Sequence, residues 1–175
     1  MKTLLTLILL NIFSGYPTQG ASSAANEFKL FSLSFKDKGP IPKKYTCQGE
    51  NVTPELQWSG IPPGTKSLAL IVDDPDAPDP QAPKMDWIHW VVYDIPVTVS
   101  KLGENGGGIQ GLNDFNKLGY GGPCPPIGEH RYFFKLYALK KTLDLPPGKT
   151  KDELLKIMQG EVLGYATLMG TYKKN

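Results

Sequence analysis

The stretch 121-GGPCPPIGEHRYFFKLYAL-139 joins a rigid turn to a strong strand pattern. Glycine and proline dominate its first eight residues, and from His130 onward every second residue is aromatic or apolar. This alternation is typical of a β-strand with one face buried in the core. The face that begins with His130 also carries Tyr132, Phe134, Leu136 and Ala138. The stretch therefore predicts a sheet protein with a histidine where one strand begins.

Strand patterns recur along the rest of the chain. They lie at residues 28–35, 67–74, 87–95 and 165–173. Alternation in the first of them predicts one face that carries Phe31, Leu33 and Phe35. Prolines end the second and third, as expected of residues that cannot continue a central strand.

One helix is expected near the C-terminus. Thr150 and Glu153 form a capping box before an apolar cluster, and Gly160 kinks or ends the helix. Several strands with Pro/Gly-rich connections and one or two late helices favour a mainly β fold over an α/β sheet. We expect an antiparallel two-sheet β-sandwich.

Length and composition limit the class of protein. A chain of 175 residues suits one domain, and 40% apolar residues are enough for a core. The formal net charge is +2, and no basic run in the globular part is longer than two residues. We therefore expect no nucleic-acid partner.

Residues 1–24 resemble a secretory signal peptide, which leaves residues 25–175 as the domain. Lys2 precedes an almost purely apolar run, and small residues follow it. The run is shorter than the roughly 20 residues that a membrane span needs. Cleavage is expected after Gly20 or Ala24, giving a periplasmic or secreted protein without a transmembrane span. An uncleaved anchor or a buried strand is the alternative.

The chain has two cysteines, Cys47 and Cys124. An even number in an exported chain suggests a disulfide bond, which would close a loop of about 76 residues. Two independent buried thiols are the alternative. No CxxC or zinc-ligand spacing is present.

Candidate functional residues are polar groups near strand ends. The motif 74-DPDAP-78 places Asp74 and Asp76 after a buried strand, although acidic turns with proline are common at strand ends. His89 lies in an apolar strand, where a histidine is usually a satisfied core residue. By period two it shares a face with Trp87, Val91, Tyr93 and Ile95.

These candidates form one site only if the fold brings His89, His130 and the two aspartates together at one end of the sandwich. The same four side chains are also a possible set of metal ligands. Local spacing of the HxH or HExxH kind is missing, so we predict no metal site and no cofactor.

Two signatures in this order resemble the phosphatidylethanolamine-binding protein family, also called Raf-kinase-inhibitor-like proteins. They are 73-DDPDAP-78 and 121-GGPCPPIGEHRY-132. Three further stretches resemble the bacterial and archaeal branch of this family: 46-TCQGENVTPELQW-58, 89-HWVVYDIP-96 and 111-GLNDFNKLGYGGPCPP-126. The resemblance runs from about Phe28 to Tyr172.

The resemblance implies a Greek-key β-sandwich with a small pocket at one end that accepts an anion such as phosphate or a phospholipid headgroup. Carried over by position, the implied ligand-binding residues are Asp74, Asp76, Pro78, Trp87, His89, Gly122, His130 and Tyr132. In this interpretation the two histidines donate N–H groups and Tyr132 its hydroxyl. The aspartates orient the imidazoles or meet an ammonium group.

The chain departs from the family pattern at two positions. Gln48 stands where the bacterial branch usually has aspartate, which puts a polar role there in doubt. Ile88 stands where the animal proteins carry histidine, which removes one polar group from the rim.

Three functions stay open from the sequence. The first is an exported module that binds a small anion or headgroup, and the second is a secreted inhibitor of a protease or signalling enzyme. The third is a hydrolase in which an Asp–His pair activates water. Ser59 and Ser67 lack a nucleophile-elbow motif, and Cys124 is excluded as a nucleophile if it is disulfide-bonded.

Overall fold

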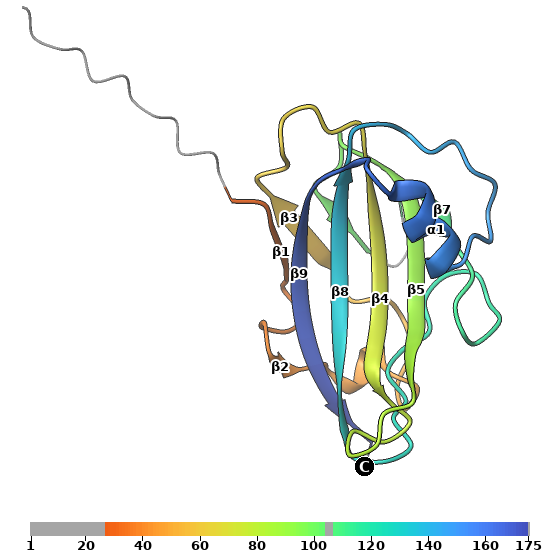
Figure 1. Cartoon of the computed structure of the whole chain (residues 1–175). Helices are drawn as coiled ribbons and strands as arrows, with labels where there is room; N and C mark the ends of the chain where they lie inside the picture. The colour runs from red at the N-terminus through yellow and green to blue at the C-terminus, as the bar shows by residue number, and fades with distance from the viewer. Residues whose placement is uncertain (1–26, 104–106, 175) are drawn as a thin grey trace, which may run out of the picture.

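Two β-sheets form most of the protein in the computed structural model, which describes residues 27–103 and 107–174. The signal peptide predicted at residues 1–24 lies outside the described residues. Four long strands dominate the larger sheet (Figure 1): β4 (Ser67–Ala77), β5 (Met85–Pro96), β8 (Glu129–Leu139) and β9 (Val162–Lys173). With the short β2 (Gly39–Pro40) and β7 (Ile109–Gln110), its order is β2-β9-β8-β4-β5-β7.

The smaller sheet has the order β1-β3-β6. Its strands are β1 (Lys29–Ser32), β3 (Leu56–Ser59) and β6 (Lys101–Leu102). Among the described strands, all pairs are antiparallel except β2 with β9, which pair in parallel over two residues. A 3₁₀ helix, η1 (Lys43–Tyr45), and one α-helix, α1 (Lys151–Met158), complete the fold.

The mainly β, two-sheet prediction is confirmed, with one short C-terminal helix. Thr150 caps α1 through the predicted capping box with Glu153. The helix ends at Met158, and Gly160 follows with a positive φ of 76°. No helix within the described ranges is long and apolar enough to cross a membrane.

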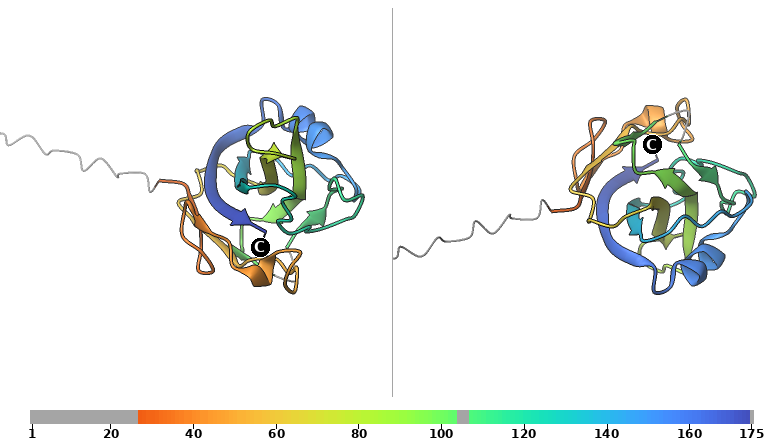
Figure 2. Two further views of the ribbon diagram at one scale, coloured as in Figure 1. Left: turned by 90° about the horizontal axis from the view of Figure 1, so that it is seen from below. Right: turned by 90° about the horizontal axis from the view of Figure 1, so that it is seen from above.

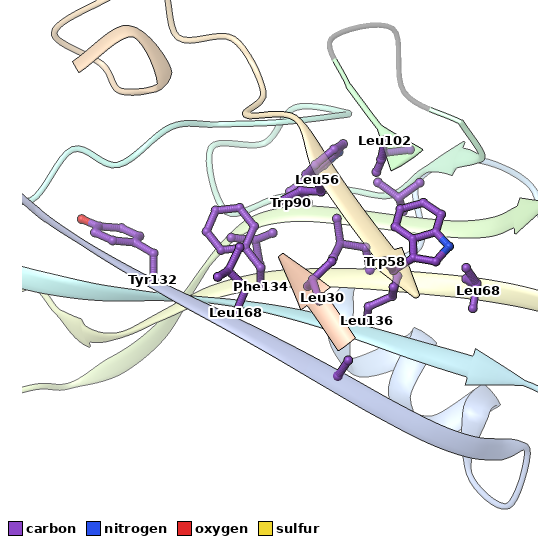
Figure 3. Packing of buried hydrophobic residues seen from close by; sticks show 14 of the residues in the cluster. Leu30, Leu56, Trp58, Leu68, Trp90, Leu102, Tyr132, Phe134, Leu136 and Leu168 are labelled. Carbon is purple, nitrogen blue, oxygen red and sulfur yellow. The ribbon is translucent and has the colours of Figure 1, made fainter. Parts of the chain in front are cut away.

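The core lies between the two sheets (Figure 3). Leu30, Leu56 and Trp58 of the smaller sheet pack against buried side chains of the larger one. These partners include Leu68, Trp90, Phe134, Leu136 and Leu168. Full burial of each such side chain stabilises the fold by roughly 1.5–3 kcal/mol.

A second, smaller apolar cluster covers the other face of the larger sheet. Leu154 and Met158 of α1 are buried against Ile71, Val91 and Tyr93. Figure 2 shows α1 on the opposite side of the larger sheet from β1 and β3. The helix therefore covers one face at the end where β4 begins, and it leaves the opposite end of the sheet uncovered (Figure 1).

The predicted face of residues 28–35 is wrong. Leu30 is buried, whereas Phe31 is 38% and Leu33 75% exposed. The register pairs Leu30 with Trp58, so Leu30 faces the larger sheet. The strand ends at Ser32, and Phe35 reaches the core from the following loop, 5.6 Å from the ring of Phe134.

The predicted alternation of β5 is also wrong at Val91 and Tyr93. The register pairs Asp73 with Ile88 and Val72 with Trp90, so His89 is the extra residue of a β-bulge. A bulge reverses the alternation that follows it. Trp90 consequently enters the core between the sheets, while Val91 and Tyr93 pack under α1. A second register shift, between Leu68 and Leu70, returns Ile95 to the core between the sheets.

Cys47 and Cys124 form a disulfide bond, which joins the loop after η1 to the loop before β8. The two Cα atoms are 5.4 Å apart, and the sequence separation is 77 residues. The neighbouring backbone is joined as well, because the Cys47 amide donates to the Pro123 carbonyl at 3.1 Å.

We predict that replacing both cysteines by alanine lowers the free energy of unfolding by about 4 kcal/mol, because a bond that closes so long a loop restricts the unfolded chain strongly. Urea denaturation monitored by circular dichroism measures this difference. Reduced wild-type protein should match the double variant. An unchanged urea midpoint after thiol labelling has shown complete reduction would contradict the prediction.

Candidate ligand-binding site

A cavity of about 330 Å³ opens at the end of the larger sheet where β4 ends and β5 and β8 begin (the lower end in Figure 1). Apolar and aromatic side chains form most of its wall, and three polar side chains reach it. The lining residues are Asp74, Ala77, Pro78, Met85, Trp87, His89, Phe115, Cys124, Pro125, Pro126 and His130. The predicted convergence of the two histidines with Asp74 is therefore present in the structure.

Asp74 and His130 form a buried pair between β4 and β8. Nδ1 of His130 lies 2.7 Å from Oδ2 of Asp74, and both side chains are at most 5% exposed. Nε2 of His130 lies 2.9 Å from the carbonyl oxygen of Ile127. Because both partners are acceptors, the ring makes both bonds when each nitrogen carries a proton. The pair then brings a cation and an anion together and fixes the loop before β8.

Asp76 turns away from the cavity and bonds to Arg131, the only arginine of the chain. Its carboxylate accepts three hydrogen bonds, from the Arg131 backbone amide and Nε at 2.9 Å each and from a terminal nitrogen at 2.7 Å. The bonding guanidinium holds the pKa of Asp76 below its ordinary value, against the opposing effect of burial. Asp76 thus joins β4 to β8 and is not part of the cavity wall.

His89 is 3% exposed and bonded on one side only. Its Nδ1 lies 2.6 Å from the carbonyl oxygen of Gly121 and therefore carries the proton of a neutral ring. Burial lowers the pKa of His89, so the neutral form prevails at pH 7. Nε2 then has a lone pair, and it has no hydrogen-bond partner.

Phe115 closes one side of the cavity. Its ring lies edge-on 5.4 Å from that of Trp87 and 5.5 Å from that of His89. Asn113 shapes the turn that carries Phe115, since its Oδ1 accepts from the amides of Phe115 and Lys117. The loop is tied to β5 by paired bonds, including Asp114 Oδ2 with the Ile88 amide at 2.7 Å.

Tyr132 lies behind the wall, with its ring edge-on 5.2 Å from that of His89 and stacked 6.4 Å from that of His130. Its hydroxyl is buried and has no hydrogen-bond partner. Burial, together with the nearby Asp74 carboxylate, raises the pKa of Tyr132. The hydroxyl is therefore a neutral group next to both imidazoles.

The structure brings together five of the eight residues predicted for ligand binding. Asp74, Pro78, Trp87, His89 and His130 line the cavity, whereas Asp76, Gly122 and Tyr132 do not.

Gly122 belongs to an adjacent cavity of about 220 Å³, and its amide donates to Asn51 Oδ1 at 2.8 Å. A Cβ there would lie 2.4 Å from that oxygen and 2.5 Å from the Tyr45 carbonyl oxygen. Close packing of two loops therefore requires this glycine.

Sequence reasoning missed the apolar wall. Met85, the first residue of β5, and Phe115, in the loop between β7 and β8, are exposed hydrophobic residues to which no periodic pattern points. Pro125 and Pro126 stand in the quoted signature, which predicts a rigid turn but not that these prolines line a cavity. Arg131, which fixes Asp76, follows His130 directly and was also overlooked.

We predict that Arg131→Met lowers the free energy of unfolding at neutral pH by about 1.5–3 kcal/mol, the range for hydrogen bonds to charged groups. The lower end is expected because the Arg131 side chain is 53% exposed. The folded-state pKa of Asp76 is lowered, so this contribution is complete above the unfolded value of about 3.9. It disappears as pH falls through the folded value.

Chemical denaturation of both proteins between neutral and acidic pH measures this effect. The difference between wild type and Arg131→Met should shrink as the pH falls, and Arg131→Lys should retain part of the stability. A difference that stays constant down to the acid transition would show that Arg131 acts through packing alone.

Both the sequence and the fold of this chain have known relatives. The family model for phosphatidylethanolamine-binding protein matches residues 31–173. A UPF0098 protein of Methanothermobacter thermautotrophicus is 51% identical over 153 residues, which cover 83% of this chain and 98% of the relative. A UPF0098 protein of Aquifex aeolicus is 46% identical over 157 residues, which cover 84% of this chain and 89% of the relative.

Two solved structures share the fold. A crystal structure of a phosphatidylethanolamine-binding protein homologue from Chlamydia trachomatis is similar with a TM-score of 0.80 and 45% identity, over 86% of this chain and 99% of that one. YbcL of E. coli, described as a new member of the mammalian family, is similar with a TM-score of 0.76 and 33% identity, over 85% of this chain and 99% of that one. On this evidence of sequence and structure, the chain belongs to the phosphatidylethanolamine-binding protein family, in its bacterial and archaeal branch.

Proposed function

We propose that this protein binds a small anion or a phospholipid headgroup in the cavity at Asp74, His89 and His130. The observation that carries the proposal is a cavity of about 330 Å³ with mostly apolar walls and three buried polar side chains. Few, convergent polar groups in an apolar concavity are typical of small-ligand sites.

The charges around the cavity are compatible with a ligand of negative charge. A lone carboxylate would repel an anion, but Asp74 is bonded to His130 and to the Asp76 amide. When His130 carries both ring protons, the pair has no net charge. A zwitterionic headgroup also fits, because the aromatic rings of Trp87 and Phe115 attract an ammonium group.

Hydrolysis by an Asp74–His130 pair is disfavoured by the two bonds that His130 makes. Nε2 of His130 is bonded to the Ile127 carbonyl and is therefore not available to take a proton from water. The described residues of the lining include no serine or threonine, and Cys124 is disulfide-bonded. Inhibition of a protease or signalling enzyme stays a prediction from the resemblance.

We predict that inorganic phosphate or phosphoethanolamine changes the fluorescence of Trp87 in a saturable manner. Trp87 lines the cavity, whereas Trp58 and Trp90 are buried in the core. His89→Ala should weaken binding on the order of tenfold or more, because it removes a buried polar contact. Fluorescence titration near pH 6 measures the dissociation constants.

Two variants serve as controls. Trp87→Phe should abolish the fluorescence change and thereby identify the reporter. Lys66→Ala removes an exposed positive charge just before β4, at the other end of the sheet, and should leave the affinity unchanged. If neither ligand binds the wild type, or if His89→Ala binds equally well, the proposal fails.

We also propose that the protein is exported to the periplasm or the medium. The apolar N-terminal run and the Cys47–Cys124 disulfide support this location, since disulfides persist in oxidising compartments. Cell fractionation with N-terminal sequencing should find a mature chain that begins at Ala21 or Ala25. Cytoplasmic recovery of a chain that retains residues 1–20 would contradict export.

A further inference from the structure

His89 lines the cavity, and its Nε2 atom is buried without a hydrogen-bond partner among the described residues. The bond from Nδ1 to the Gly121 carbonyl fixes the tautomer, so Nε2 of the neutral ring is a hydrogen-bond acceptor. An unsatisfied buried polar group destabilises the free protein. A ligand that supplies the missing hydrogen bond removes this penalty and binds more tightly.

Burial makes protonation of Nε2 unfavourable, although most of the groups that face this ring favour it. Asp74 of β4 favours an imidazolium, whereas His130 of β8 opposes it. Tyr132, also of β8, presents a neutral phenol, and the loop from Gly111 to Gly122 contributes the Phe115 ring and a carbonyl oxygen. Burial outweighs these effects and lowers the pKa of His89. His89 therefore offers an acceptor, Nε2, where an anion ordinarily meets donors.

We propose that the cavity selects an oxyacid that still carries a proton, with His89 as the specificity-determining residue. The ligand class is a phosphomonoester or inorganic phosphate in its singly charged form, whose P–OH group donates to Nε2. This inference rests on the proposed function and narrows it. A phosphodiester and sulfate carry the same kind of oxygen atoms but no acidic proton near neutral pH, and they leave Nε2 without a partner.

Calorimetric titration of the wild-type protein at pH 6 tests the selection. The probes are methyl phosphate, dimethyl phosphate and sodium sulfate. Methyl phosphate should bind on the order of ten- to a hundredfold more tightly than the other two, which corresponds to one unmade hydrogen bond to a buried group. Equal affinity for methyl phosphate and dimethyl phosphate would overturn the inference while leaving anion binding intact.

The pH dependence gives a second readout. The second pKa of a phosphomonoester is about 6, so its protonated fraction falls from about one half at pH 6 to about one hundredth at pH 8. Affinity for methyl phosphate should fall on the order of fiftyfold over that range, because the binding form disappears. If His89 instead supplied the proton, sulfate would bind well at pH 6, and that result contradicts the inference.

The variant His89→Gln tests whether His89 is responsible for the preference for methyl phosphate. Its amide offers both a donor and an acceptor near the position of Nε2, so sulfate gains a partner and the preference for methyl phosphate should approach unity. Thermal unfolding of the variant checks that the domain is intact. An intact variant that retains the full preference would show that a group other than His89 recognises the proton of the ligand.

Flotation with vesicles separates the two sources of this chemistry. Phosphatidic acid is a monoester, whereas phosphatidylglycerol is an anionic diester. If vesicles with phosphatidic acid capture the protein and vesicles with phosphatidylglycerol do not, the ligand is a lipid headgroup. If the protein binds methyl phosphate but no vesicle, the ligand is a soluble phosphomonoester or free phosphate. Both outcomes support the protonated monoester. Capture by both lipids in proportion to surface charge would overturn it. Absence of binding by every probe would instead remove the proposed function itself.

Discussion

The buried bond between Asp74 and His130 is the interaction on which the site depends. It joins the last residues of β4 to the first residues of β8. The second nitrogen of the same ring is hydrogen-bonded to the Ile127 carbonyl oxygen. Removing one partner would leave an unpaired polar or charged group in the interior, at a cost of about 3–5 kcal/mol for a buried ion pair. One histidine thus joins two strands and holds the loop that carries Ile127.

Irregularities in the larger sheet place the remaining groups. A regular β5 would put His89 on the face of Val91 and Tyr93, under α1. The bulge at His89 reverses that alternation, so Trp87 and His89 face the cavity while Trp90 still enters the core. The Phe115 loop and the Cys47–Cys124 disulfide then close the sides of the cavity. The cavity is consequently built from segments that are far apart in the chain.

The two histidines differ in what they offer a ligand. His130 has both nitrogens engaged and acts on the protein, whereas His89 keeps one nitrogen unsatisfied. Desolvation keeps the His89 ring neutral, and the carbonyl partner on Nδ1 leaves Nε2 as the acceptor. The proposed ligand class follows from this asymmetry, because an acceptor recognises a proton on the ligand and not its charge. The same cavity with a protonated His89 would instead recognise any oxyanion.

By itself, the sequence determined the mainly β fold, the capped helix and most of the polar site, because alternation, the capping box and two specific signatures are local patterns. It also identified Asp74, His89 and His130 as candidate ligand-binding residues. Tertiary structure alone decided which side chains meet the cavity. The bulge in β5, the pairing of Asp76 with Arg131 and the position of Phe115 depend on neighbouring strands and loops. A periodic pattern cannot record an extra residue whose place is fixed by its partner strand.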